Sequence, residues 1–258
     1  MSQPIANSVA FVTGANRGIG AALVEALLAR GASKVYAAAR NISTLDAIVA
    51  RGEGRVIPVS LEVTDLDAIR AAAALASDTT LLINNAGVVA SAFRPISDIS
   101  TIDDLRLELE VNAIAPHAIT QAFAPSMIAA KHGTVVNVAS VVSLVSYPVV
   151  PTYSASKATT HSITQSWRHT LAPHGVNVLG VYPGPVDTDM ARALPIDKTP
   201  VTDVAHAILD GIEAGVQEIL PDPVAVAQGA QYLANPKELE RLVSQQMMQQ
   251  EAQETVAA

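Results

Sequence analysis

The 258-residue sequence contains no cysteine, which excludes disulfide bonds and thiolate metal sites. Aromatic residues make up only 3% of the chain and charged residues only 16%, whereas half of all residues are hydrophobic. A core of sufficient size must therefore be built mainly from alanine, valine, leucine and isoleucine. The six histidines show no H-x-x-x-H spacing and no clustering with carboxylates, so the sequence predicts no metal site.

An excess of positive charge and a long apolar run are also missing. The 16 lysines and arginines are spread along the chain and the formal net charge is −8, so we expect no nucleic-acid partner. No apolar run reaches the roughly 18 residues of a membrane span, and we expect no membrane partner. Residues 1–7 have neither the basic nor the apolar region of a secretory signal. We therefore expect a cytoplasmic protein.

Apolar, strand-like runs alternate with amphipathic, helix-like segments along the chain. This alternation predicts a single α/β domain, in which helices cover both faces of a doubly wound parallel sheet of about seven strands. The predicted strands are residues 8–13, 34–39, 55–60, 80–84, 133–139, 176–182 and 217–220. The predicted helices include residues 17–30, 65–76, 102–131, 152–171 and 203–214.

Proline and composition set the remaining expectations for the architecture. Pro58 lies inside the third predicted strand, while Pro116 and Pro125 should bend or split the long helix, with a break near Asn112. We expect the cofactor-binding and catalytic domain to span residues 1–235. Residues 236–258 are rich in glutamine and glutamate, which predicts a terminal helix followed by a loose polar tail.

A glycine-rich turn, Thr13-Gly-Ala-Asn-Arg-Gly-Ile-Gly20, follows the first predicted strand. Its G-x-x-x-G-x-G spacing differs from the G-x-G-x-x-G fingerprint, and no Lys-Ser/Thr follows to make a P-loop. Glycines nevertheless allow the backbone to approach a pyrophosphate, and the next helix presents its N-terminal N–H groups to the anion. The position directly after the first strand favours nucleotide binding over a turn that needs glycine only for its own dihedral angles.

Tyr153 and Lys157 lie one helical turn apart within the predicted helix 152–171. A neighbouring ammonium favours the phenolate and lowers the tyrosine pKa. The Ser140 hydroxyl, thirteen residues earlier, could hold a substrate oxygen against the phenol. Together these groups suit the protonation of a carbonyl or the deprotonation of an alcohol. The Tyr-x-x-x-Lys pair alone is a weak signal, because such pairs are common on exposed helix faces.

Several motifs occur in a characteristic order: Thr13-Gly-x-x-x-Gly-x-Gly20, Asn84-Asn-Ala-Gly87, Asn112, Ser140, Tyr153-x-x-x-Lys157 and Pro183-Gly184. Over residues 9–188 this combination resembles the short-chain dehydrogenase/reductase (SDR) family. The resemblance implies a one-domain Rossmann fold and an NADP-preferring carbonyl reductase or alcohol dehydrogenase. A nucleotide-binding regulatory protein without catalysis and a nucleotide-sugar epimerase are the alternatives. The intact catalytic set argues against the first, and the Gly14–Gly18 spacing and the short C-terminal part argue against the second.

The resemblance also implies a role for each matching residue. Tyr153 would be the catalytic acid/base, Ser140 would polarise the substrate oxygen, and Lys157 would lower the tyrosine pKa and bind the nicotinamide ribose. Asn112 would hold a water in a proton relay to Lys157. The implied cofactor-binding residues are Gly14, Asn16, Arg17, Gly18, Ile19, Gly20, Arg40, Glu62, Val63, Asn85, Ala86, Gly87, Tyr153, Lys157, Pro183, Gly184, Val186 and Thr188. Glu62 is a departure, because the family commonly has Asp or Asn there to meet the adenine amine.

The end of the second predicted strand favours NADP(H) over NAD(H). NAD-using relatives place an acidic side chain there, which accepts hydrogen bonds from the ribose 2′-hydroxyl. Here the strand ends Ala37-Ala-Ala-Arg40, without an acidic residue. Arg40 and Arg17 would instead supply two guanidinium groups to a 2′-phosphate.

The residues expected around the substrate are mostly apolar. The predicted substrate-binding set is Ser140, Val142, Tyr147, Val150, Tyr153 and Met190, with Val88, Val89, Val141 and Val149 as further walls. They predict an open pocket that accepts bulky, uncharged ketones. Small residues along helix 152–171, together with the family resemblance, predict a homodimer or homotetramer.

Overall fold

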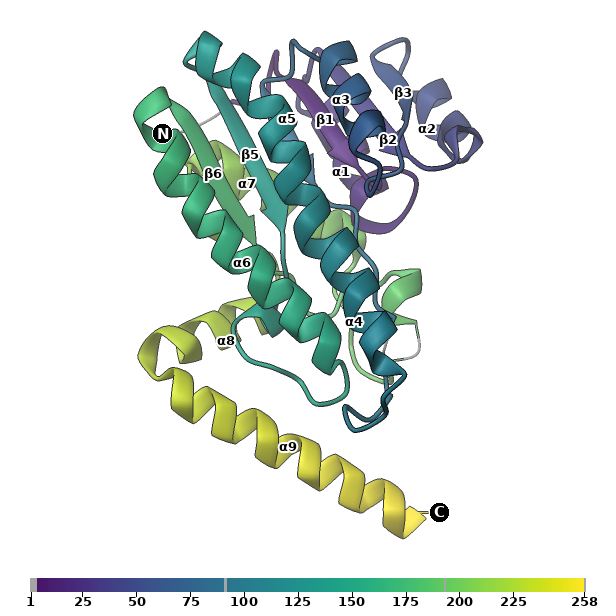
Figure 1. The fold of residues 1–258 in the computed structure, drawn as a ribbon, viewed down its shortest axis with the longest axis vertical. Coiled ribbons are helices and arrows are strands. Elements are labelled where there is room, and N and C mark those ends of the chain that lie inside the picture. The colour runs from purple at the N-terminus through teal and green to yellow at the C-terminus, as the bar shows by residue number, and fades with distance from the viewer. Residues whose placement is uncertain (1–3, 91, 193, 258) are drawn as a thin grey trace.

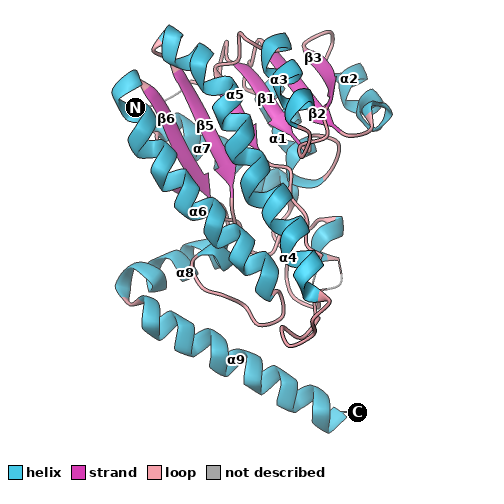
Figure 2. Ribbon diagram, viewed as in Figure 1, coloured by secondary structure: helices cyan, strands magenta, loops and turns pink. Residues whose placement is uncertain are grey.

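One parallel sheet of seven strands organises the computed structural model, which describes residues 4–90, 92–192 and 194–257, with side chains as far as Met247. The strand order is β3-β2-β1-β4-β5-β6-β7, and every neighbouring pair is parallel (Figures 1 and 2). The predicted doubly wound sheet is therefore confirmed. The strands are β1 (Val9–Thr13), β2 (Lys34–Ala39), β3 (Val56–Ser60), β4 (Leu81–Asn84), β5 (Gly133–Val138), β6 (Val176–Val181) and β7 (Glu218–Ile219).

Helices cover both faces of the sheet. The helices α4, α5 and α6 lie over one face, where α3 packs beside α5, and α1 and α7 pack together over the other (Figure 1). The helices that precede β7 in the chain are α1 (Gly18–Ala29), α2 (Asp46–Arg51), α3 (Leu66–Leu75), α4 (Thr101–Leu109), α5 (Ala115–Ala130), α6 (Pro151–Leu171) and α7 (Val201–Ala214).

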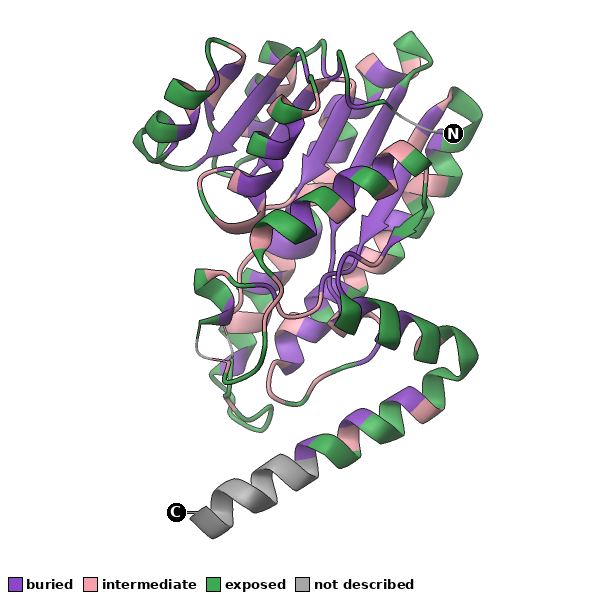
Figure 3. Ribbon diagram, turned by 180° about the vertical axis from the view of Figure 1, so that it is seen from behind, coloured by how far each residue is buried: buried purple, intermediate pink, exposed green. Residues whose placement is uncertain are grey.

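The two faces of the sheet have separate hydrophobic cores, because successive side chains of a strand point to opposite faces. In β1, Ala10 and Val12 belong to the core under α1 and α7. Phe11, between them, packs on the other side against Phe123 of α5, with ring centroids 4.8 Å apart. The strands are buried on both sides (Figure 3), as expected for a parallel sheet covered by two helical layers.

The strand order reverses between β1 and β4, which places a topological switch point there. In open parallel sheets, ligands bind outside the carboxyl ends of the strands at this point. The glycine-rich turn follows β1 and Asn85-Ala-Gly87 follows β4, so both sequence motifs lie at this edge.

The prolines explain where the chain departs from regular geometry. Pro58 lies in β3, an edge strand, where proline is tolerated. The expected break near Asn112 is a π-helical segment, η2 (Glu110–Ile114), because Pro116 has no N–H to offer the Asn112 carbonyl four residues earlier. The predicted split at Pro125 is wrong, since α5 continues through it.

The C-terminal part forms two helices, α8 (Pro223–Ala234), which the sequence did not predict, and α9 (Pro236–Ala257). Where a loose tail was expected, α9 continues to Ala257, because no glycine or proline follows Pro236 and the residues there favour helix. Buried apolar residues spaced by four along α9, Leu239, Val243 and Met247, form a small cluster with Val145. In the described part of the chain, no helix combines the length and hydrophobicity needed to cross a bilayer.

Candidate functional site

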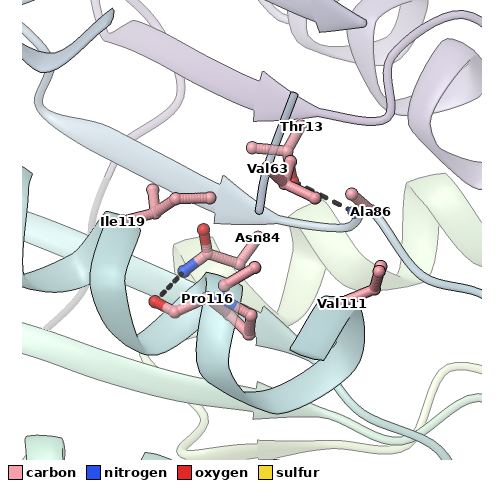
Figure 4. Close-up of a pocket in the computed structure, with 8 residues that line it drawn as sticks. Thr13, Val63, Asn84, Ala86, Val111, Pro116 and Ile119 are labelled. Carbon is pink, nitrogen blue, oxygen red and sulfur yellow. Dashed lines mark hydrogen bonds between the residues drawn. The ribbon is translucent and has the colours of Figure 1, made fainter. Parts of the chain in front are cut away.

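Side-chain hydrogen bonds join the ends of β1 and β4 at the switch point. The Thr13 hydroxyl oxygen accepts the backbone N–H groups of Asn85, at 2.9 Å, and Ala86, at 3.0 Å (Figure 4). In return, the Asn85 amide nitrogen donates to the Thr13 carbonyl at 2.9 Å. The two motif-bearing turns are therefore held as one rigid wall.

The glycine-rich turn is tightly packed and requires glycine at three positions, Gly14, Gly18 and Gly20. Gly14 and Gly18 adopt φ angles of +63° and +55°, and a Cβ on Gly20 would lie 2.1 Å from the Gly14 carbonyl oxygen. No side chain caps the N-terminus of α1, where Arg17 is the capping residue, so its first N–H groups can bind an anion. A cleft of about 320 Å³ begins at Gly18. It is lined by Gly18, Asp187, Thr188, Asp189, Arg192, Lys198 and Val201.

Behind this wall, Val63 is buried in a small recess with Val111 and Ile119 (Figure 4). Val63 therefore supports the cofactor wall by packing. The neighbouring Glu62 is exposed, and its Oε1 accepts the N–H and the hydroxyl of Thr64 at 3.3 and 3.1 Å. Contact between Glu62 and adenine stays a prediction.

Ser140 follows β5 and begins the short 3-10 turn η3 (Val141–Ser143). Its hydroxyl donates to the Pro183 carbonyl at 3.3 Å, and the N–H of Val141 donates to the same oxygen at 3.0 Å. The Pro183–Gly184 turn is held in addition by Asp222, whose carboxylate accepts the Gly184 N–H at 2.7 Å. These contacts fix the serine hydroxyl at the carboxyl end of the sheet.

Tyr153 and Lys157 lie in the first two turns of α6. The Lys157 ammonium is 5.7 Å from the centre of the Tyr153 ring and donates to the Val138 carbonyl at 2.8 Å. Burial lowers the pKa of Lys157 to about 8. Burial also raises the pKa of Tyr153, hydrogen bonding with Ser140 lowers it, and the Glu108 carboxylate raises it. The pKa of Tyr153 is raised overall, so the predicted lowering by Lys157 is wrong for this arrangement, because burial disfavours the phenolate.

Asn112 lies at the centre of η2 and is almost fully buried. Its side-chain amide nitrogen donates to the Ser156 hydroxyl at 2.9 Å, and its backbone carbonyl accepts a hydrogen bond from the Thr160 hydroxyl at 2.7 Å. A Cβ on Gly87 would lie 3.2 Å from Asn112 Oδ1 and 3.6 Å from Lys157 Nζ. The structure thus brings Asn112 and Lys157 together beside Gly87. Lys157 in turn lies near the Tyr153 ring, and Tyr153 is hydrogen-bonded to Ser140.

The two arginines predicted to bind a 2′-phosphate are not in contact with each other among the described residues. Arg17 reaches across the cleft to Asp189, with the charged atoms 3.4 Å apart. Arg40 is exposed directly after β2, at the expected position. Arg17 is therefore paired with an acidic residue, and the phosphate clamp stays a prediction.

The predicted substrate-binding residues surround the start of α6 in part. Val142 and Val150 are half-buried, whereas Met190 is 49% exposed. Tyr147 is half-buried and its hydroxyl accepts a hydrogen bond from the Gln228 amide of α8. Contact between these side chains and a substrate stays a prediction. Within the described residues, no group of three potential metal ligands occurs.

The sequence alone did not identify four polar residues at this site: Glu108, Arg192, Lys198 and Asp222. The Asp222-Pro223 pair was the available signal for the last, because it is typical of a capped helix start, and Asp222 also caps α8 through the Ala225 N–H at 2.9 Å. The other three belong to no motif. Arg192 and Lys198 line the cleft at Gly18 together with Asp187 and Asp189, and Arg192 forms an ion pair with Asp189.

Comparison with known proteins gives a consistent family assignment. The sequence profile described as short chain dehydrogenase matches residues 8–199. The 3-oxoacyl-[acyl-carrier-protein] reductase FabG of Vibrio cholerae is 31% identical over 89% of this chain and 90% of its own length. L-xylo-3-hexulose reductase of Hypocrea jecorina is 30% identical over 74% of this chain and 70% of its own length.

Solved structures extend the comparison to three dimensions. A short chain dehydrogenase from Burkholderia cenocepacia in complex with NADP superposes with a TM-score of 0.87 at 37% identity, covering 93% of this chain and 99% of that one. A short chain dehydrogenase/reductase from Burkholderia phymatum in complex with NAD gives a TM-score of 0.78 at 27% identity, covering 87% and 92%. Similar structures therefore contain either dinucleotide.

Proposed function

Because the chain belongs to the short chain dehydrogenase family, we propose that it is an NADP(H)-dependent oxidoreductase that reduces uncharged, hydrophobic ketones and aldehydes, or oxidises the corresponding alcohols. One observation carries the proposal. Ser140, Tyr153, Lys157 and Asn112 converge at the carboxyl ends of β4 and β5.

The proposed chemistry follows from these four side chains. Bound nicotinamide supplies or accepts the hydride. In reduction, Tyr153 donates its proton to the carbonyl oxygen, while the Ser140 hydroxyl turns from Pro183 to hold that oxygen. The Lys157 ammonium stabilises the resulting phenolate and returns a proton to it. Asn112 would hold a water that connects Lys157 with solvent.

The cofactor site fits a dinucleotide on three grounds. The Gly14–Gly20 turn is so tightly closed that Gly20 cannot carry a Cβ, the N-terminus of α1 is uncapped, and a cleft starts at Gly18. The preference for NADP(H) rests on Arg40 after β2 and on the missing acidic residue there. The NADP complex of the Burkholderia cenocepacia relative supports the same choice.

The decisive experiment is NADPH oxidation by the purified protein with a panel of carbonyl compounds. The panel contains bulky ketones, aldehydes and diketones, together with a 3-oxoacyl thioester and a ketohexose as the substrate classes in the relatives' names. We expect turnover with uncharged hydrophobic ketones. Tight NADPH binding without turnover on any member would instead support the non-catalytic regulatory protein.

Tyr153→Phe tests the assignment of the acid/base directly. The substitution removes the proton-transferring hydroxyl but keeps the ring, so kcat should fall by at least ~10²-fold. The dissociation constant for NADPH, measured by cofactor fluorescence, should change little. Near-normal turnover in this variant would refute the assignment.

A further inference from the structure

The segment that leaves the Asn84–Gly87 motif is tied to the α4–η2 helix by two side chains one turn apart. Asn112 Oδ1 accepts the Val88 N–H at 2.9 Å, and the Asn112 amide donates to the Val88 carbonyl at 2.9 Å. Glu108 Oε1 accepts the Ala90 N–H at 2.7 Å. Asn112 therefore fixes the backbone of Val88, and Glu108 fixes the backbone of Ala90, both against the same helix.

Glu108 is unusual because its carboxylate is completely buried, with an exposed fraction of 0%. A carboxylate is rarely buried unless its charge is used or compensated. The helix α4 packs against α6, and the negative charge of Glu108 acts on the Tyr153 phenol. One side chain therefore links the wall segment 88–90 with the environment of the proposed acid.

The other groups that act on Tyr153 come from neighbouring elements. On α6, the Lys157 ammonium lies 5.7 Å from the ring centre, and after β5 the Ser140 hydroxyl is hydrogen-bonded to the phenol. The η2 segment contributes the neutral Asn112 and the carboxylate of Glu110. Across the described residues around the phenol, Glu108 is thus the acidic group whose charge it senses.

On the basis of the oxidoreductase function proposed above, we propose that Glu108 is a positioning residue that fixes the segment 88–90 and keeps Tyr153 in its proton-donating form at alkaline pH. The Lys157 ammonium and the positive charge of an oxidised nicotinamide both favour the phenolate. The Glu108 carboxylate opposes them. It thereby extends to higher pH the range over which Tyr153 can protonate a carbonyl. It also raises the pH at which alcohol oxidation reaches half of its maximal rate.

Glu108→Gln tests the charge with almost no change in shape. The pH at which kcat/KM for carbonyl reduction falls by half should move down by at least about one unit, because a unit charge shifts a pKa by roughly one unit even from about 12 Å at an effective dielectric constant near 20. The half-maximal pH of alcohol oxidation should move down by the same amount. The tyrosinate absorbance of each enzyme, measured against its Tyr153→Phe counterpart, gives the shift without turnover.

Two further variants separate charge from position. Glu110→Gln removes a carboxylate from the same helix, two residues away, and should leave the pH profile unchanged. Glu108→Asp keeps the charge, so the midpoints of its pH profiles should stay near those of the wild type. Its shorter side chain cannot reach the Ala90 N–H, so KM for a bulky ketone should rise. If Glu108→Gln unfolds, Glu108→Asp still tests the position.

The outcomes distinguish the two proposals. A wild-type enzyme that turns over no carbonyl refutes the proposed function itself. An active wild type whose Glu108→Gln variant has the same midpoints as Glu110→Gln, or loses rate at every pH without any shift, refutes the role of Glu108.

Discussion

Arg40 is the side chain that we expect to decide between NADPH and NADH under the proposed function. It is exposed immediately after β2, where NAD-using relatives carry an acidic residue. Arg40→Ala should raise the KM for NADPH by roughly ten- to a hundredfold, the effect of losing one charge-assisted hydrogen bond, and should leave the NADH value nearly unchanged.

Arg70→Ala is a suitable control for Arg40→Ala. Arg70 is another exposed arginine, on α3, and it pairs with Asp67 at 2.6 Å. It should leave the kinetics of both cofactors unchanged. A wild-type enzyme that prefers NADH, or an Arg40→Ala variant weakened equally for both cofactors, would contradict the assignment.

Lys157 gives a pH-dependent prediction for the stability of the cofactor-free protein. Its folded-state pKa of about 8 lies below the ordinary value of 10.5. Below pH 8 both folded and unfolded chains carry the proton, so the full cost of burying the charge is present. As the pH rises from 8 to 10.5, the folded chain releases the proton first, and this cost disappears.

We therefore expect Lys157→Met to be more stable than the wild type at pH 7, by about 1–3 kcal/mol. The difference should shrink steadily towards pH 10. Thermal unfolding of both proteins at several pH values measures it. A difference that stays constant across this range would show that the ammonium is not destabilised by burial.

At the same scale, sequence motifs located the reactive residues but not their electrostatic setting. The spacing of Tyr153 and Lys157 was sufficient to place them on one helix face. The net rise in the tyrosine pKa depends on burial and on Glu108, which comes from a different helix. An electrostatic interaction between residues 45 positions apart has no local signature, so it could not be read from either segment.

The elements were predictable where hydrophobic periodicity is strong, and the failures have identifiable causes. All seven strands were expected, because buried parallel strands appear as continuous apolar runs. The helix α8 was missed because its twelve residues, PVAVAQGAQYLA, include an alanine-rich, weakly patterned stretch and an internal glycine. The length of α9 was missed because polar composition was taken to indicate disorder, although glutamine and glutamate also favour helix.

The helix α9 supports the loop that carries Tyr147. Leu239 is 2% exposed and packs in the cluster with Val145 and Tyr147. Leu239→Ala should weaken the docking of α9 by about 2–4 kcal/mol, the usual cost of a buried leucine truncation. Hydrogen exchange should accelerate in α9 and in residues 144–150, and KM for bulky ketones should rise while NADPH affinity is unchanged.

Leu242, on the same helix, provides the matched control because it is 37% exposed. Leu242→Ala should stay within about 0.5 kcal/mol of the wild type. Equal effects of the two substitutions would mean that the cluster does not hold α9 in place.

For the whole molecule, an assembly through the α4–α5 and α6 face is the principal expectation. Ala155, Ala158, Ser162 and Ser166 are exposed on α6, whereas Ser156, which the sequence grouped with them, is buried against Asn112. Small exposed residues allow a second copy to approach closely, and most such assemblies have two-fold symmetry.

Ala158→Arg should therefore convert a dimer into monomers or a tetramer into dimers, halving the mass measured by light scattering at micromolar concentration. Ala50→Arg introduces the same side chain at an exposed position of α2, on the other side of the molecule, and should not change the mass. A monomeric wild type would contradict the prediction.

The π-helical segment Glu110–Ile114 also determines how far α4 is rotated about the helix axis relative to α5. Each residue in an α-helix turns the chain by about 100°. A π turn holds one residue more than a regular turn, so it sets the angle at which α4 meets α5. Deleting one residue there would swing the upstream face by about that angle relative to α5. Glu108 would then leave both Ala90 and Tyr153, although every remaining residue of α4 would still be helical.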